Sequence, residues 1–258
     1  SFAFYLLSYI VYGGVLSVLA RAAIHDQLQG DVYKHLNLVA FLTAVLGIIT
    51  ERSAFSLLHV AVAFFITNDG FAHGTKSFKG PSADEMKGWI GMRKEVRYLV
   101  LNDAKGVIKK VMNKNAQVYR LVTLLFAFAA LGYHLPVLIK YHLSGQSGAM
   151  LPARILAVQR MLLASGITSV LMVSAEKKCL NKFMPMRLNW LMSVYCILGG
   201  ITTFAQKMIG RTGNAVKSYH LIPSGVIIVI GCFHAAKYIE ALRATWQLTS
   251  ATSSQDIY

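Results

Sequence analysis

The sequence predicts an all-α fold: a polytopic membrane bundle of about six transmembrane helices, with one long basic amphipathic helix outside the membrane. Three observations lead to this prediction. Only 14% of the 258 residues are charged and 55% are hydrophobic, with a mean hydropathy of +0.50, whereas soluble domains carry about 25% charged residues. Several apolar runs reach the roughly 20 residues that a spanning helix needs. None of the clearest runs alternates with a period of two, as the strands of a transmembrane barrel do.

The same composition excludes two other classes of protein. The chain is too apolar to remain disordered in water. A disulfide-stabilised scaffold is also excluded, because three cysteines are few and odd in number, and Cys179, Cys196 and Cys232 show no paired spacing.

Five apolar runs qualify as spans, and a sixth region is ambiguous. The five clear runs are residues 4–24, 118–139, 155–175, 189–208 and 221–242. Residues 36–67 form two apolar stretches hinged at Glu51 and Arg52. Each half is roughly 22 Å of helix, which is short for a span, and together they make about 48 Å, which is long. They form either one long tilted helix or a hairpin of two short ones, and we favour one helix, giving six spans.

The polar interval 68–117 predicts the extramembrane helix. Ser82 and Glu85 have the spacing of a capping box at a helix start, and apolar residues then recur at helical spacing among many basic ones. This helix lies on the membrane surface or packs beneath the bundle. The interval divides the chain into an N-terminal transmembrane region (1–67), the basic segment (68–117) and a C-terminal four-helix region with a polar tail (118–258).

Uneven positive charge predicts the orientation. The formal net charge is +15. Ten Lys and Arg residues lie in 68–117, and four more follow Ala175. With six spans these two segments share one face, which the positive-inside rule places toward cytosol or matrix together with both termini. Because the sequence begins at Ser1 without Met, we expect a processed start. We therefore favour the mitochondrial inner membrane, with another organelle membrane as an alternative.

Part of this basic charge predicts a lipid-binding surface. Topology and solubility account for most of the Lys and Arg, but contact with anionic headgroups such as those of cardiolipin is a sharper interpretation. The candidates are Arg93, Lys94, Arg97, Lys177 and Lys178. Nucleic acid is not an expected partner, because no recognition fold or aromatic stacking motif accompanies the basic residues.

Ionisable residues within the apolar runs are candidate functional groups, because burying charge in a membrane is costly. Glu51 and Arg52 form either an interfacial hinge pair or a buried ion site. Arg160 lies inside its span, where it snorkels or pairs with Glu51 or Glu240. Lys237 and Glu240 are spaced i, i+3 and predict an interfacial salt bridge.

Four histidines show a spacing that matches haem ligation. His59 and His73 are 14 positions apart, as are His220 and His234, which is roughly 21 Å of helical rise with both rings on one face. This spacing resembles that of cytochrome b and the ferric-reductase-type membrane cytochromes, which implies two bis-histidine haems. The resemblance covers these four residues only. The Asn68-Asp69-Gly70 break and Pro223 depart from it, so hydrogen-bonded or interfacial histidines are the main alternative.

No catalytic motif is present: the sequence lacks HExxH, a P-loop, GxSxG and CxxC. We therefore expect no enzyme activity and no required cofactor beyond bound phospholipid. The function that we favour is a structural subunit of a large membrane complex, such as a respiratory complex or ATP synthase, with other membrane subunits as partners. A b-type haem cytochrome is the first alternative and a transporter or channel the second.

Overall fold

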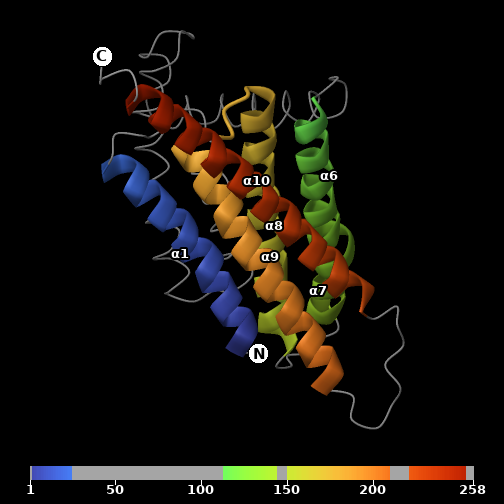
Figure 1. Ribbon diagram of the computed structural model, residues 1–258. Helices are drawn as coiled ribbons and strands as arrows, with labels where there is room; N and C mark the ends of the chain where they lie inside the picture. The colour runs from blue at the N-terminus through green and yellow to red at the C-terminus, as the bar shows by residue number, and fades with distance from the viewer. Residues whose placement is uncertain (1, 25–112, 144–149, 210–220, 254–258) are drawn as a thin grey trace, which may run out of the picture. The chain divides into compact units, whose positions relative to one another are not determined.

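The computed structural model describes residues 2–24, 113–143, 150–209 and 221–253. Every element within these ranges is helical, which confirms the all-α prediction for this part of the chain. In chain order the elements are α1 (Phe2–Ile24), α6 (Lys114–Phe128), the π-helix η3 (Ala129–His134), α7 (Leu135–Leu143), α8 (Met150–Glu176), α9 (Phe183–Ile209) and α10 (Ile222–Ser253) (Figure 1).

Four helical stretches among the described residues are long and apolar enough to cross a membrane: Lys114–Val137, Ala157–Glu176, Phe183–Met208 and Ile222–Gln247. They match four of the predicted spans. α1 is helical over residues 4–24, but its apolar stretch Gly13–Ala22 is shorter than the 18 residues of a candidate span. The ambiguous region 36–67 and nearly all of the predicted amphipathic segment 68–117 lie outside the described residues. A membrane-embedded helical protein is therefore supported, while six spans and the basic helix stay predictions.

Two helices extend further than the apolar runs. α9 begins at Phe183, six residues before the predicted start, and α10 continues to Ser253, past the predicted end at residue 242. A hydropathy pattern marks only the part of a helix that suits hydrocarbon, whereas backbone hydrogen bonds continue the helix into its polar flanks.

The π-helix η3 precedes a proline within the first C-terminal span. Pro136 lacks the N–H that would bond the carbonyl four residues back. The backbone widens over Ala129–His134, and the N–H of Leu135 donates to the carbonyl of Ala130, five residues earlier. The wider turn accommodates the proline ring without ending the helix.

Contacts divide the chain into two units, and unit 1 contains α1, α9 and α10. α9 packs against both α1 and α10. Gly14 on α1 faces Leu191, and Leu7 approaches Gly199, so the numbers fall along α1 as they rise along α9. Gly231 on α10 faces Ile197, whereas His234 meets Asn189, so α10 is also antiparallel to α9.

Because α1 and α10 both run antiparallel to α9, the first residue of α1 and the last residue of α10 lie at opposite ends of α9. The Phe2 end of α1 lies beside the C-terminal end of α9, and the Ser253 end of α10 lies beside the N-terminal end of α9 (Figure 1). A bilayer crossed by all three helices places these two ends at opposite faces. The prediction that both termini share the basic face assumes an even number of crossings, and it stays a prediction, because the candidate spans among the described residues do not include α1.

Unit 2 contains α6, η3, α7 and α8. α6 packs along α8, and Asn113 at the start of α6 donates from Nδ2 to the carbonyl of Ala175 near the end of α8 (2.8 Å). These two helices are thus antiparallel. Their core is mainly apolar and contains Tyr119, Val158, Leu163, Ile167 and Leu171, each with less than 2% of its surface exposed.

Candidate functional site

The most buried polar contact in unit 1 joins α9 to α10. His234 and Asn189 are both 0% exposed, and Nδ1 of His234 lies 2.9 Å from Oδ1 of Asn189. The Nδ2 group of Asn189 donates to the carbonyl of Pro185 one turn earlier (3.2 Å). Because Nδ2 is used as the donor, Oδ1 must accept, and Nδ1 of the imidazole must carry the hydrogen. The pair therefore fixes the tautomer of His234 as well as the position of its ring.

Small residues allow the two helices to come close enough for this contact. A Cβ at Gly231, one turn before His234, would lie 3.0 Å from the backbone nitrogen of Ile197 and closer still to its side chain. A Cβ at Gly200 would lie 3.0 Å from the carbonyl oxygen of Ser224. Glycine at such positions lets backbones approach in a membrane, where side-chain packing and polar contacts hold helices together.

Unit 2 contains a second polar contact, made by hydroxyl groups between α6 and α8. Thr123 Oγ1 donates to the carbonyl of Tyr119 (2.8 Å) and lies 3.0 Å from Thr168 Oγ1. Ser165 Oγ donates to the carbonyl of Thr123 (3.1 Å), and Thr168 Oγ1 lies within 3.0 Å of the carbonyls of Ala164 and Ser165. The hydroxyls of Thr123 and Thr168 thus contact carbonyls of their own helices and each other, and the Ser165 hydroxyl donates to the neighbouring helix.

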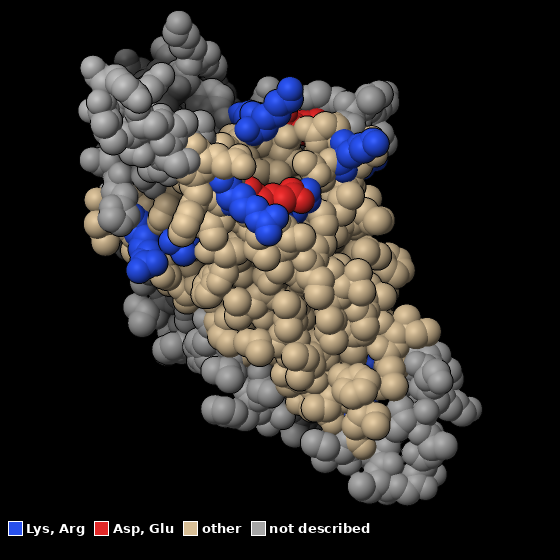
Figure 2. Space-filling view, viewed as in Figure 1, with Lys and Arg blue, Asp and Glu red and all other residues tan. Residues whose placement is uncertain are grey.

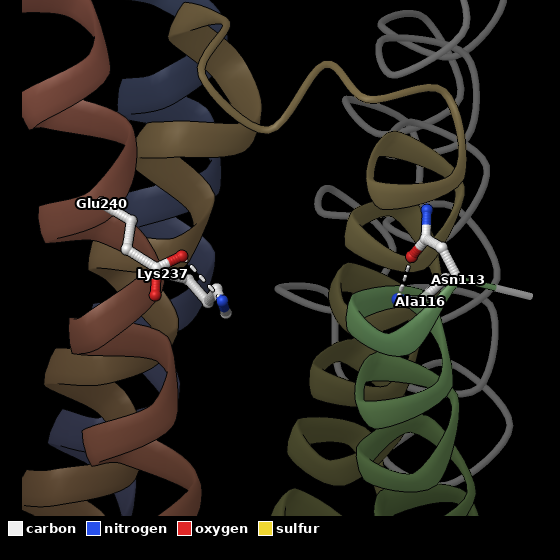
Figure 3. A network of polar contacts seen from close by, with 4 residues as sticks. All are labelled: Asn113, Ala116, Lys237 and Glu240. Atoms are coloured by element: carbon white, nitrogen blue, oxygen red, sulfur yellow. Dashed lines mark hydrogen bonds and ion pairs between the residues drawn. The ribbon is translucent and has the colours of Figure 1, made fainter.

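Asn113 holds the polar end of the same helix pair. Its Oδ1 accepts the N–H of Ala116 (2.8 Å), which caps α6 (Figure 3). Its Nδ2 donates to Ala175 of α8. One side chain therefore satisfies a backbone donor at the start of one helix and a backbone acceptor near the end of the other.

The structure describes five of the predicted site residues outside the contacts above. Arg160 is buried on α8, with 7% of its surface exposed. Lys177 and Lys178 are exposed in the turn between α8 and α9. Lys237 Nζ lies 2.7 Å from Glu240 Oε2 on α10, the i, i+3 pair that the sequence predicts (Figure 3). The lysine side chain is 14% exposed and the glutamate 62%, so this pair borders solvent.

The remaining predicted site residues lie outside the described part of the chain. They are Glu51, Arg52, His59, His73, Arg93, Lys94, Arg97 and His220. Of the four histidines in the haem hypothesis, the structure therefore describes His234 alone, and its ring is enclosed where α9 and α10 pack. Within the described residues no group of three or more His, Cys, Asp or Glu side chains is placed to hold a metal ion.

The sequence pattern did not single out Asn189, Thr123, Ser165 or Thr168. The apolar run predicts a span that begins at Asn189, and the earlier start of α9 instead places this residue nearly two turns inside the helix. A neutral polar residue in an apolar run is a usable signal, because such a group needs a partner in hydrocarbon. The signal shows that a partner exists and leaves the partner's identity open.

Comparison with known proteins adds no relative: no family model, curated protein or solved structure matches the chain.

Proposed function

We propose that the chain is a non-catalytic structural subunit of a large membrane complex, that it scaffolds neighbouring subunits, and that it binds anionic lipid. The assembly we favour is a respiratory complex or an ATP synthase of the mitochondrial inner membrane. The observation that carries the proposal is the use of buried polar side chains. His234 bonds Asn189, and Thr123 bonds Thr168. These groups join one helix to another, as structural contacts do.

The outward faces of two helices support the scaffolding part of the proposal. In the candidate spans on α6 and α10 only 22% of residues are buried. Large apolar side chains point outward there, including Leu121, Phe128 and Leu131 on the first and Ile222 and Val229 on the second, each at least 50% exposed. Such faces suit lipid tails or the helices of neighbouring subunits.

Co-purification tests this proposal. The tagged chain is extracted from its native membrane in a mild detergent and separated by native electrophoresis. We expect it to migrate in one large assembly with defined other subunits, and to dissociate from them in a harsher detergent. Migration as a single chain with lipid alone would contradict the proposal.

The same preparation tests the two alternatives. A b-type cytochrome predicts a Soret band that is lost in the His234→Leu variant but retained in a Thr203→Val control, whose hydroxyl bonds only its own helix. A transporter or channel predicts flux in vesicles that falls when Arg160, Glu51 or Lys237 is neutralised. Either result would replace the structural proposal.

A further inference from the structure

We propose that one end of unit 1 carries a basic collar that binds the phosphate headgroups of anionic phospholipids. The collar consists of Arg21, Lys178, Lys182, Arg187, Lys237 and Arg243. This inference deepens the proposed function and rests on it for the membrane embedding of unit 1. It assigns the lipid contact to a defined set of residues on α1, α10, and α9 with the turn before it, and of these the sequence analysis proposed only Lys178 as a lipid contact.

Helix direction brings these residues to one level. Arg21 lies in the last turn of α1, Lys178 and Lys182 immediately precede α9, and Arg187 lies in its second turn. Lys237 and Arg243 follow His234, which meets Asn189 near the same end of α9. Because α1 and α10 both run antiparallel to α9, the C-terminal parts of these two helices and the N-terminus of α9 lie at the same end.

The charge at this end is one-sided. Among the described residues of unit 1 there are seven Lys and Arg and one acidic residue, Glu240. Six of the seven belong to the collar, and Lys207, near the C-terminal end of α9, is the seventh. On the face that Figure 2 shows, which includes residues of both units, blue side chains with a few red ones lie toward the upper end, and much of the described surface below them is uncharged.

Four collar residues are open to contact. Arg21, Lys178, Lys182 and Arg243 are exposed, whereas Arg187 and Lys237 are half-buried. Arg187 lies over the ring of Phe183 (5.5 Å from the guanidinium carbon to the ring centroid), and Lys237 pairs with Glu240. Arg21, Lys178 and Lys182 therefore flank apolar stretches, and Arg243 lies near the end of the candidate span Ile222–Gln247. We expect the phosphate groups of a bilayer at this level.

The backbone at Lys178 gives an independent indication. Its φ is +55°, and it is the one non-glycine residue with a positive φ among those described. Glycine occupies this position after a helix most readily, and a lysine there is strained. A strained backbone that retains a long cationic side chain is consistent with use of that side chain in binding.

Trp246 provides a local reporter, because it lies one turn beyond Arg243 and is 71% exposed. In the test, Trp89 and Trp190 are changed to Phe, and the full chain is reconstituted in vesicles of phosphatidylcholine and phosphatidylglycerol. Bromine is carried by one lipid or the other at the same mole fraction. The ratio of the two quenching efficiencies gives the enrichment of the anionic lipid beside Trp246.

We expect about fivefold or greater enrichment of phosphatidylglycerol, since each basic residue near a surface favours anionic lipid by about that factor. High salt should reduce it. Replacing Arg21, Lys178, Lys182 and Arg243 by Gln should bring the ratio close to one, whereas the matched Lys207→Gln control should keep it. Lys178→Gly alone should lower the enrichment while leaving thermal stability unchanged or raised, which separates lipid binding from folding.

An equal ratio for the two lipids in the parent protein would overturn the proposal, as would an unchanged ratio in the fourfold variant or an equal loss in Lys207→Gln. The vesicles contain no partner subunit. A negative result for lipid enrichment therefore does not affect the co-purification result. Conversely, a chain that co-purifies with no subunit can still show the enrichment.

Discussion

Gly231 shows how a single atom limits the distance between α9 and α10. A Cβ there would meet the backbone of Ile197, which cannot move aside without bending α9. We expect Gly231→Ala to destabilise the protein by about 1–3 kcal/mol, the usual cost of overpacking. The measurement is thermal unfolding in detergent, followed by near-ultraviolet circular dichroism.

Gly225 on the same helix is the matched control, because nothing lies within 4 Å of a Cβ built on it. Gly225→Ala should be neutral or slightly stabilising, since alanine favours a helix more than glycine does. Equal destabilisation by the two substitutions would show that a general effect of alanine in α10, rather than the contact with α9, is responsible.

The His234–Asn189 pair predicts a coupling energy. Asn189→Ala leaves a fully buried imidazole without its acceptor, so we expect a loss of about 1–3 kcal/mol. His234→Leu should cost a similar amount of stability, because the buried Asn189 side chain then loses the imidazole as its hydrogen-bond partner. The double variant Asn189→Leu/His234→Leu should cost less than the sum of the single variants Asn189→Leu and His234→Leu. Strict additivity of the two single Leu changes would argue against a direct contact.

At the scale of helices, Asn113 performs two separable roles, capping α6 and bonding α8. Asn113→Asp keeps the accepting oxygen and removes the amide donor, so it tests the bond between helices alone. Asn113→Ala removes both roles. We expect Asn113→Ala to cost about 1–2 kcal/mol and Asn113→Asp to cost less, because a carboxylate also favours a helix N-terminus. The order of the two unfolding midpoints measures this, and a reversed order would contradict the assignment of the cap.

The sequence predicted helices better than it predicted helix partners. The apolar runs at residues 118–139 and 155–175 were sufficient to place two spans, because hydrocarbon demands about 20 apolar residues and few charges. No periodic pattern indicates that Asn113 reaches Ala175, or that Asn189 faces His234 across 45 positions. Those contacts depend on which faces of two helices meet, and an apolar face in a membrane protein suits lipid and protein alike.

At the scale of the whole molecule, the prediction of topology depended on the number of times that the chain crosses the membrane. Arg21, Lys178 and Arg187 carry the positive charge that the positive-inside rule uses, and in unit 1 they lie at one end. The sequence analysis placed the loop after Ala175 on the basic face, and this placement stays a prediction. It assigned the N-terminus to the same face, because it counted the ambiguous region 36–67 as one crossing. Helix direction within unit 1 carries information that charge counting lacks.

Residue labelling can decide the orientation of α1. In a background with the native cysteines replaced by alanine, single cysteines are introduced as Phe2→Cys and Ser253→Cys, and a third variant retains Cys179 alone, in the turn before α9. Sealed membranes are treated with a maleimide that cannot cross a bilayer, before and after permeabilisation.

Because α1 runs antiparallel to α9, we expect position 253 and Cys179 to label from the same side and position 2 from the other. Labelling of positions 2 and 253 from one side would show that α1 does not cross beside α9 and α10, and would restore an even number of crossings. Arg21 would then lie apart from the other basic residues of the collar, and its neutralisation alone should leave lipid enrichment at Trp246 unchanged, so the two experiments check each other.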